Sequence, residues 1–191
     1  MSEASQARAR AAYGDLPMRF ERNQGQFDRR VRFAARGAGY ALWLTGDEAV
    51  LSLHGGERQP SADAGRGQFA QDERRAPAYQ AHTAAIRMKL LNANRAAAVT
   101  GETEMAGRSN YFVGNDAAKW RAGVSNYAKV VYGGVYRGVD MIYYGNGREL
   151  EYDFKVAAGA NPAAIAWRVG GTKRLRVDTN GELVMGTAAG E

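Results

Sequence analysis

The fold is decided by residues 138–156, which read GVDMIYYGNGRELEYDFKV. Two alternating runs flank Asn146-Gly147, a dipeptide that favours a type I′ turn because both central residues need a positive φ. Side chains alternate across a strand, so each face of the expected hairpin has its own composition. An apolar face is predicted to carry Val139, Met141, Tyr143, Leu150, Tyr152 and Phe154, and an acidic face Asp140, Ile142, Tyr144, Glu149, Glu151 and Asp153. This pattern predicts a β-hairpin with one face in the core.

The register of this hairpin follows from counting outward from the two-residue loop. Tyr144 would then face Glu149, and Asp140 would face Asp153. Like charges at directly opposed positions destabilise a sheet. We therefore expect the two aspartates to be offset by a bound cation, by an arginine, or by a shared proton with one raised pKa.

The acidic face leaves three interpretations open. Asp140 and Asp153 would hold Ca²⁺, with Glu149 and Glu151 supplying some of the about six to eight oxygen ligands that this ion takes. Paired carboxylates are also the groups with which glycosidases work. The third interpretation is a ladder of arginines and carboxylates on a solvated sheet face. We expect this third arrangement, with no catalytic residue and no cofactor; calcium bound by Asp140 and Asp153 is the alternative.

Length and composition indicate one globular domain. The 191 residues are enough for a single core, and 24 glycines with only four prolines suit many tight turns. Cysteine is absent, which excludes disulfides. The net charge of +6 comes mostly from arginines spread along the chain, a pattern typical of a solvated surface and not of a nucleic-acid site. No run approaches the about 18 apolar residues of a membrane-spanning helix.

Short alternating runs recur along the chain. They lie at residues 31–35, 40–45, 49–54, 84–91, 97–105, 111–113, 127–132, 165–169, 174–177 and 183–185. Turn signals such as Asn23-Gln24-Gly25 and Asn180-Gly181 separate them. Only Asn115-Asp116 is expected to cap a helical turn, through residues 117–119. Roughly a dozen short strands predict an all-β, antiparallel, sandwich-like domain.

The chain is expected to consist of a tail and one domain that contains an insertion. Residues 1–15 are expected to form a flexible tail, and residues 16–191 a single β domain. Residues 55–83 lack periodicity and contain two of the four prolines, so we expect an exposed insertion between two strands. The strand pattern continues almost to Glu191, which suggests a piece of a longer polypeptide.

Side chains suited to nucleophilic or metal chemistry are sparse. Both histidines, His54 and His82, flank or lie in the insertion, and no serine has the GxSxG setting of a hydrolase. Most aromatic residues are expected in the core. Trp120 is the exception, because it lies in the polar stretch NDAAKWRAG. The candidate ligand-binding residues are therefore Trp120, Tyr144, Asp140, Glu149, Glu151 and Asp153.

Several blocks resemble one known family. They are LPMRFERNQGQFD (16–28), VRFAARGAGYALWLT (31–45), EAVLSL (48–53), RSNYFVGNDAAKW (108–120), YAKVVYGGVYRGVDMIYYGNGRELEYDFKVAAGANPAAI (127–165) and LRVDTNGELV (175–184). Together they are similar to the uncharacterised N-terminal domain found ahead of SBBP-type β-propeller repeats in exported or cell-surface bacterial proteins. The similarity runs over about residues 16–185.

The resemblance implies an extracytoplasmic β-rich module with propeller or immunoglobulin-like domains downstream, and it brings no catalytic residues. We therefore expect a non-catalytic binding, adhesion or scaffolding module of a secreted or surface protein, with a protein or glycan ligand. The alternative is a glycan-binding or glycan-cleaving domain that uses Asp140, Glu151, Asp153 and Trp120.

Overall fold

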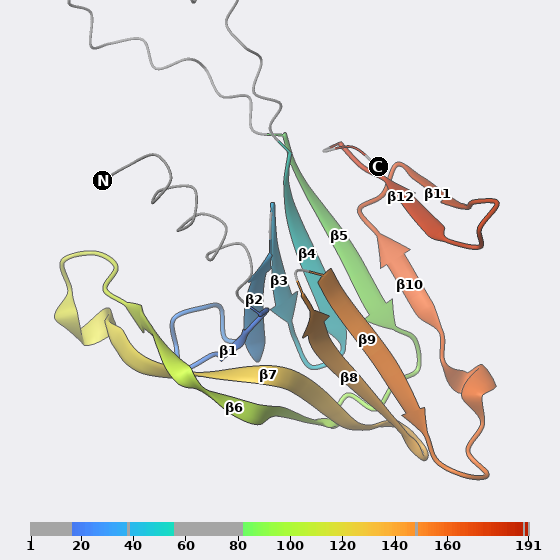
Figure 1. Cartoon of the computed structure of the whole chain (residues 1–191), viewed down its shortest axis with the longest axis horizontal. Helices are drawn as coiled ribbons and strands as arrows, with labels where there is room; N and C mark the ends of the chain where they lie inside the picture. Colours follow the sequence, from blue (N-terminus) through green and yellow to red (C-terminus); the bar gives the residue numbers. More distant parts are fainter. Residues whose placement is uncertain (1–16, 38, 56–81, 148, 189, 191) are drawn as a thin grey trace, which may run out of the picture.

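The computed structural model describes residues 17–37, 39–55, 82–147, 149–188 and 190, which are almost entirely β (Figure 1). The strands are β1 (Phe20–Arg22), β2 (Phe33–Gly37), β3 (Tyr40–Leu44), β4 (Glu48–Gly55), β5 (His82–Leu90), β6 (Ala98–Tyr111), β7 (Arg121–Tyr136), β8 (Val139–Asn146), β9 (Glu149–Val156), β10 (Trp167–Gly170), β11 (Arg174–Val177) and β12 (Leu183–Gly186). Two one-turn 3-10 helices, η1 (Ala117–Lys119) and η2 (Pro162–Ala164), complete these elements. In these described ranges no helix is long and apolar enough to cross a membrane. The predicted all-β class is confirmed.

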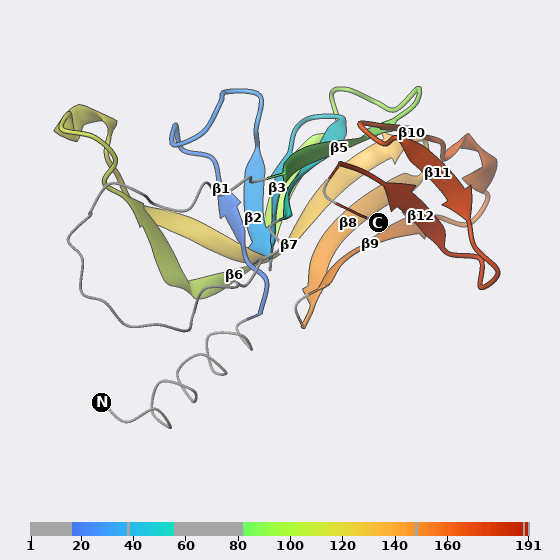
Figure 2. The ribbon, with the colours of Figure 1, turned by 90° about the horizontal axis from the view of Figure 1, so that it is seen from above.

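Ten strands form one antiparallel sheet. Its order is β10-β5-β4-β3-β2-β1-β7-β8-β9, and β6 pairs with β7 alongside this path. Figures 1 and 2 show that the sheet curls, so that its two halves face each other across a core as in a half-barrel. The hairpin β11–β12 is a separate two-stranded sheet. The sandwich-like arrangement expected from the sequence is thus made by one curled sheet.

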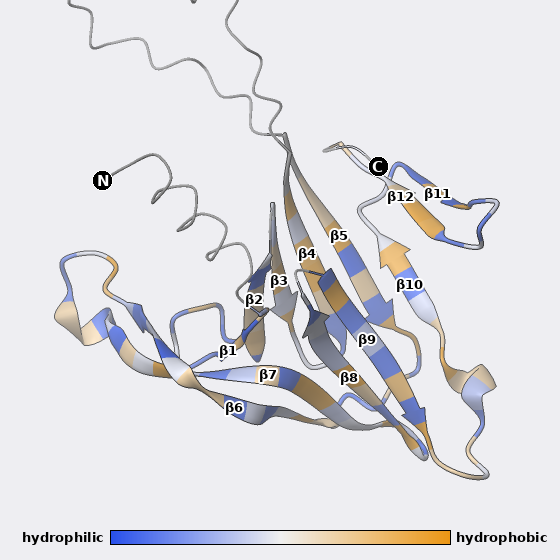
Figure 3. Cartoon of the chain, in the orientation of Figure 1, coloured by the Kyte–Doolittle hydropathy of each residue, from blue (hydrophilic) through white to orange (hydrophobic). Residues whose placement is uncertain are grey.

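Alternation along each strand places one face in the core. Phe20 lies opposite Ala35, and Leu42 lies opposite Leu51, so these side chains share the inner face. Figure 3 shows the resulting bands of hydrophobic and hydrophilic residues along strands such as β5 and β9. Burial of a side chain such as Phe20, which is 0% exposed, contributes about 1.5–3 kcal/mol. The periodicity of the sequence therefore reports the inner face correctly.

The two ends of the sheet meet through aromatic rings. Trp167 of β10 lies 5.6 Å from Tyr152 and 6.1 Å from Phe154 of β9, measured between ring centroids. No ladder of backbone hydrogen bonds joins these two described strands. We call this contact the β9–β10 seam. The expectation that Trp167 packs in the core is correct, whereas Trp43 lies edge-on to Phe27 at 5.2 Å outside that core.

The hairpin β8–β9 has the predicted faces but not the predicted register. Asn146 is itself paired, with Glu149, so the turn lies one position later and includes Gly147 at φ 60°. Tyr144 consequently lies opposite Glu151, and Asp140 lies opposite Lys155. The predicted pairing of Asp140 with Asp153 is wrong. A shift of two residues keeps every side chain on its face, so the hydrophobic pattern could not reveal it.

Other boundaries differ in detail. The run predicted at 97–105 belongs to a longer strand, β6, which pairs with β7 through two irregularities in register. The strand predicted at 111–113 is wrong beyond Tyr111, because β6 ends there. Gly55 and His82 pair as the last residue of β4 and the first of β5, so residues 55, 82 and 83 of the predicted insertion belong to strands. Residues 56–81 and the expected tail at 1–15 lie outside the described residues. The predicted turn at Asn180-Gly181 joins β11 to β12.

Candidate functional site

Asp140 is engaged by the backbone of a neighbouring strand. Its Oδ1 accepts a hydrogen bond of 2.7 Å from the amide of Gly134 in β7, and Lys155 is its cross-strand neighbour. A carboxylate that fixes a backbone amide has a structural role next to a break in the register of β7 and β8. The like-charge pair that suggested calcium binding is therefore absent at Asp140.

The remaining acids of the hairpin surround one phenol. Tyr144 donates a hydrogen bond of 3.0 Å to Oδ2 of Asp153, and Asn146 donates one of 2.8 Å to Oε1 of Glu151. The neighbouring carboxylates of Glu151 and Asp153 raise the pKa of Tyr144 to about 12. The ammonium of Lys129 lies 5.7 Å from the centre of the Tyr144 ring. This cluster is an exposed, mutually satisfied network of polar side chains.

The structure thus brings together only some of the six residues predicted to bind a ligand. Tyr144, Glu151 and Asp153 meet, while Trp120 lies on another hairpin. In the part of the chain that is described, no three acidic, histidine or cysteine side chains are placed to hold a metal ion. Neither of the two cavities described below is lined by these residues.

Trp120 belongs to an exposed tip between β6 and β7, which we call the hairpin tip (residues 112–120). Phe112, Val113 and Trp120 are 60%, 74% and 41% exposed. The rings of Phe112 and Trp120 lie edge-on at 5.4 Å. The indole Nε1 donates to the carbonyl of Gly114 at 3.1 Å. Apolar side chains are therefore presented to solvent in a fixed arrangement.

Two further groups hold the hairpin tip. Asp116 caps η1 by accepting from the amide of Ala118 at 3.1 Å, as predicted from the sequence. Arg121 donates to the carbonyls of Ala118 and Trp120 at 2.9 and 2.8 Å, and to that of Gln24 at 3.0 Å. The last contact ties the tip to the loop between β1 and β2.

A buried polar cluster lies beside the hairpin tip, and sequence reasoning missed it. Glu21 and Asn126 are only 5% and 1% exposed. The Glu21 carboxylate accepts from Arg36 at 3.2 and 3.1 Å, from Ser109 at 3.0 Å and from Tyr111. Burial, and then the bond to Glu21, raise the pKa of Tyr111. Because the carboxylate is fully satisfied, the cluster fastens β6 to β1 and β2. The only signal in the sequence was a glutamate within a run that alternates like a strand.

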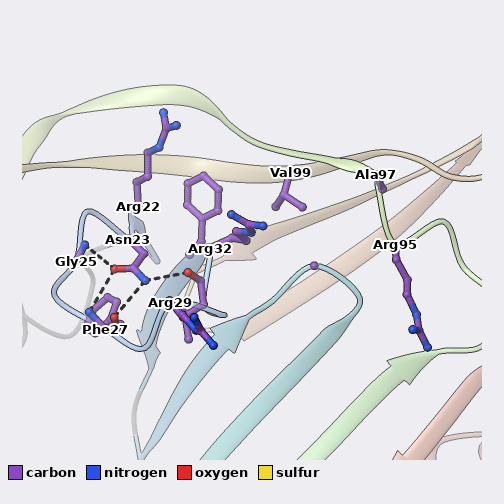
Figure 4. A pocket seen from close by; sticks show the side chains of 12 residues that line it. Arg22, Asn23, Gly25, Phe27, Arg29, Arg32, Arg95, Ala97 and Val99 are labelled. Atoms are coloured by element: carbon purple, nitrogen blue, oxygen red, sulfur yellow. Dashed lines mark hydrogen bonds between the residues drawn. The ribbon is translucent and has the colours of Figure 1, made fainter.

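A cavity of about 510 Å³ opens beside the β1–β2 loop (Figure 4). Its lining consists of Arg22, Asn23, Gly25, Phe27, Arg29, Val31, Arg32, Phe33, Gly46, Arg95, Ala97 and Val99. Asn23 shapes the loop, because its Oδ1 accepts from the amides of Gly25 and Phe27 at 2.9 and 3.2 Å. Its Nδ2 donates to the carbonyl of Val31 at 2.9 Å. We call this the arginine cavity.

A second cavity of about 460 Å³ lies next to it and shares Val31, Arg32 and Gly46. Its lining also includes Trp43 and three acids, Asp28, Asp47 and Glu48. These acids are paired with cations: Arg30 lies 3.0 Å from Asp28, Arg87 lies 2.8 Å from Glu48, and Lys89 lies 3.2 Å from Asp47. The acids line only the second of these two cavities and are paired with cations, whereas Arg32 lines both cavities.

Comparison with known proteins gives one family. No curated protein matches the chain, and no solved structure matches it. Residues 20–191 match a family described as a domain of unknown function, DUF7948. This match covers every strand of the curled sheet and the hairpin β11–β12. The chain therefore belongs to the DUF7948 family.

Proposed function

We propose that this domain is a non-catalytic binding module of a secreted or cell-surface protein, and that it contacts its partner through the hairpin tip. The observation that carries the proposal is the exposure of Phe112, Val113 and Trp120 on a tip fixed by hydrogen bonds. Adjoining apolar side chains that stay exposed in a folded domain are typical of an interaction site. Tryptophan in particular is enriched among the residues that dominate binding energy.

The fixed geometry of the tip favours binding. Arg121 and Asp116 already hold the backbone that carries the aromatic rings. Ordering a loop on binding costs free energy, so a tip that is ordered beforehand loses less of its interaction energy. The tip therefore suits recognition better than a loop without such bonds.

The absence of catalysis is supported by how the acids are used. Asp140 binds a backbone amide, and Glu151 and Asp153 accept hydrogen bonds from Asn146 and Tyr144. The resemblance to the domain that precedes SBBP repeats supports an extracytoplasmic location, with propeller or immunoglobulin-like domains as neighbours. The proposal requires no cofactor.

A glycan ligand is the second candidate. Aromatic rings bind the apolar faces of sugars, and the paired rings of Phe112 and Trp120 belong to the same hairpin tip as the polar residues Asn115 and Asp116. A glycan-cleaving domain would instead need Glu151 or Asp153 as a catalytic group.

The test is retention of the protein on whole bacterial cells and on a panel of insoluble polysaccharides, with new reducing ends measured in the same tubes. Trp120→Ala and Phe112→Ala should abolish retention. Leu175→Ala, which removes a side chain that is 49% exposed on β11, should leave it unchanged. Retention on polysaccharide would identify a glycan ligand.

Three results would overturn the proposal. One is retention that survives both tip substitutions, and another is no retention on any surface. The third is release of reducing ends that disappears in Asp153→Asn, because the domain would then be an enzyme. Melting temperatures of all variants check that each protein remains folded.

A further inference from the structure

We propose that the arginine cavity binds a compact ligand carrying at least two oxyanion groups, that is, carboxylate, sulfate or phosphate groups on one small skeleton. This site is separate from the hairpin tip, and the inference does not depend on the function proposed above.

The charge of the lining is the first argument. Arg22, Arg29, Arg32 and Arg95 contribute four guanidinium groups, and no acid belongs to the lining. Among the described residues, the structure gives no hydrogen-bond or ion-pair partner to the side chains of the first three. Arg95 lies 3.7 Å from Asp47, which also pairs with Lys89 at 3.2 Å. A cavity lined by one sign of charge concentrates ligands of the opposite sign.

The neighbouring cavity provides the contrast within the same molecule. Asp28 precedes Arg29 and Arg30 in the chain, yet its carboxylate pairs with Arg30, on the side of the second cavity. Arg87 is likewise paired with Glu48. Arg29 acts on the charge of Asp28, since it helps to lower the pKa of that carboxyl, but the ion pair of Asp28 is with Arg30. Acids are thus available close by, and Arg22, Arg29 and Arg32 still have hydrogen-bonding capacity for a ligand. Arginine suits this role because its planar fork binds two oxygens of one oxyanion.

The size and walls of the cavity favour a compact ligand. A volume of about 510 Å³ lies within the range of small-molecule pockets, about 300–1,000 Å³. Phe27, Phe33 and Val99 supply apolar surface for a carbon skeleton. Asn23 fixes the loop that forms one wall. A long polyanion would instead call for a stripe of cations along an open surface.

The placement of the arginines favours several anionic groups over one. Figure 4 shows Arg22, Arg29, Arg32 and Arg95 distributed around the cavity, with their guanidinium groups pointing in different directions. A single phosphate ion could contact only some of them. A skeleton that carries two or more oxyanions can reach arginines on different walls at once.

The experiment is isothermal titration calorimetry of the full chain at a constant ionic strength of about 0.15 M. The probes are sucrose octasulfate, tripolyphosphate and citrate, with sucrose and inorganic phosphate as controls. The double variant Arg29→Gln with Arg32→Gln removes two cavity charges. Lys173→Gln with Arg174→Gln removes two exposed charges near β11, far from the cavity in Figure 1, and serves as the charge-matched control.

We expect at least one multivalent probe to bind and to raise the melting temperature of the protein. Its affinity should fall at least about tenfold in the cavity variant and stay unchanged in the matched control and in Trp120→Ala. Comparison of the affinities for the sulfated, phosphorylated and carboxylated probes identifies the kind of oxyanion that the cavity prefers.

Three outcomes would overturn the inference. They are no binding of any multivalent probe at about 1 mM, equal weakening in the cavity variant and its matched control, and tighter binding of a short DNA duplex that competes for the site. The last result would assign the arginines to an extended polyanion. Because Trp120 is not part of this cavity, none of these outcomes bears on the proposed role of the hairpin tip, which is tested separately.

Discussion

Tyr111 donates a hydrogen bond to the buried carboxylate of Glu21, although the two residues are 90 positions apart in the chain. Arg36 completes this contact, since its guanidinium lies 3.0 Å from the Tyr111 hydroxyl and 5.7 Å from the centre of the Phe27 ring. Phe27 in turn lines the arginine cavity. One buried acid therefore links the strand that leads to the hairpin tip with the loop that forms the cavity wall.

Removal of this acid should destabilise the fold. In Glu21→Ala, Ser109, Tyr111 and Arg36 lose their common acceptor, and we expect the free energy of unfolding to fall by about 2–4 kcal/mol. Urea unfolding followed by circular dichroism measures the loss. Asp28→Asn is the control, because Asp28 and Arg30 are 54% and 78% exposed, and it should cost less than about 1 kcal/mol. Similar losses in the two variants would refute the conclusion that the buried carboxylate of Glu21 stabilises the fold.

We expect Tyr144 to lose its proton at a higher pH than an ordinary tyrosine. The carboxylates of Glu151 and Asp153 raise its pKa to about 12, so folding favours the neutral phenol. Its contribution to stability is complete below pH 10, the usual pKa, and disappears as the pH rises through 12. The difference in absorbance at alkaline pH between the protein and Tyr144→Phe isolates this titration.

In the variant that combines Glu151→Gln with Asp153→Asn, the pKa of Tyr144 should move down toward its usual value. Asp140→Asn should leave the pKa of Tyr144 unchanged, because the Asp140 carboxylate binds the amide of Gly134 and not Tyr144. If the pKa of Tyr144 stayed the same after both acids were replaced, the hydrogen-bond network described for this hairpin would be contradicted.

Two glycines with nearly the same backbone should respond differently to alanine. Gly171 and Gly181 have φ values of 83° and 87°, so either substitution costs about 1–2 kcal/mol of backbone strain. At Gly171 the new Cβ would also lie 1.8 Å from the carbonyl oxygen of Ala85, whereas at Gly181 it meets no atom within 4 Å. We expect a further loss of about 1–3 kcal/mol at Gly171. Thermal unfolding compares the two, and equal losses would show that β10 does not pack this closely on β5.

Asn23→Ala should loosen the β1–β2 loop. The substitution removes an acceptor for the amides of Gly25 and Phe27 and a donor to Val31. We expect a loss of about 1–3 kcal/mol in the free energy of unfolding. Amide hydrogen exchange should rise at residues 24–31 more than in β8. Unchanged exchange in the loop would show that other contacts hold the wall of the arginine cavity.

The faces of the strands could be predicted from the sequence, but the register of the central hairpin could not. Asn146-Gly147 is a strong turn signal, yet Asn146 is itself paired with Glu149, so the turn begins one position later, at Gly147. Both placements leave a two-residue loop and put Met141 and Tyr143 in the core. Since the side-chain period is two, a shift of two residues changes only the partners across the strands. The predicted pairing of Asp140 with Asp153 depended on the register, and it is wrong because the register is shifted.

The arginine cavity and the Glu21 cluster could not be predicted because each is assembled from distant segments. Arg22, Arg29 and Arg32 are close in the chain, but Arg95 comes from the connection between β5 and β6. Along the sequence these residues are indistinguishable from other arginines on a solvated surface. Trp120 was easier to place, because an aromatic residue in a polar stretch already suggested exposure.

The β9–β10 seam has a mechanical consequence. A tension that pulls these two strands apart is opposed by the ring contacts of Tyr152 and Phe154 with Trp167, each worth about 0.5–1.5 kcal/mol beyond burial. Between the described strands, each pair of neighbours in the sheet order is joined by a ladder of backbone hydrogen bonds, and several of these bonds must break together. Under load, the curled sheet would therefore open first along this line, before the ladders of its strand pairs break.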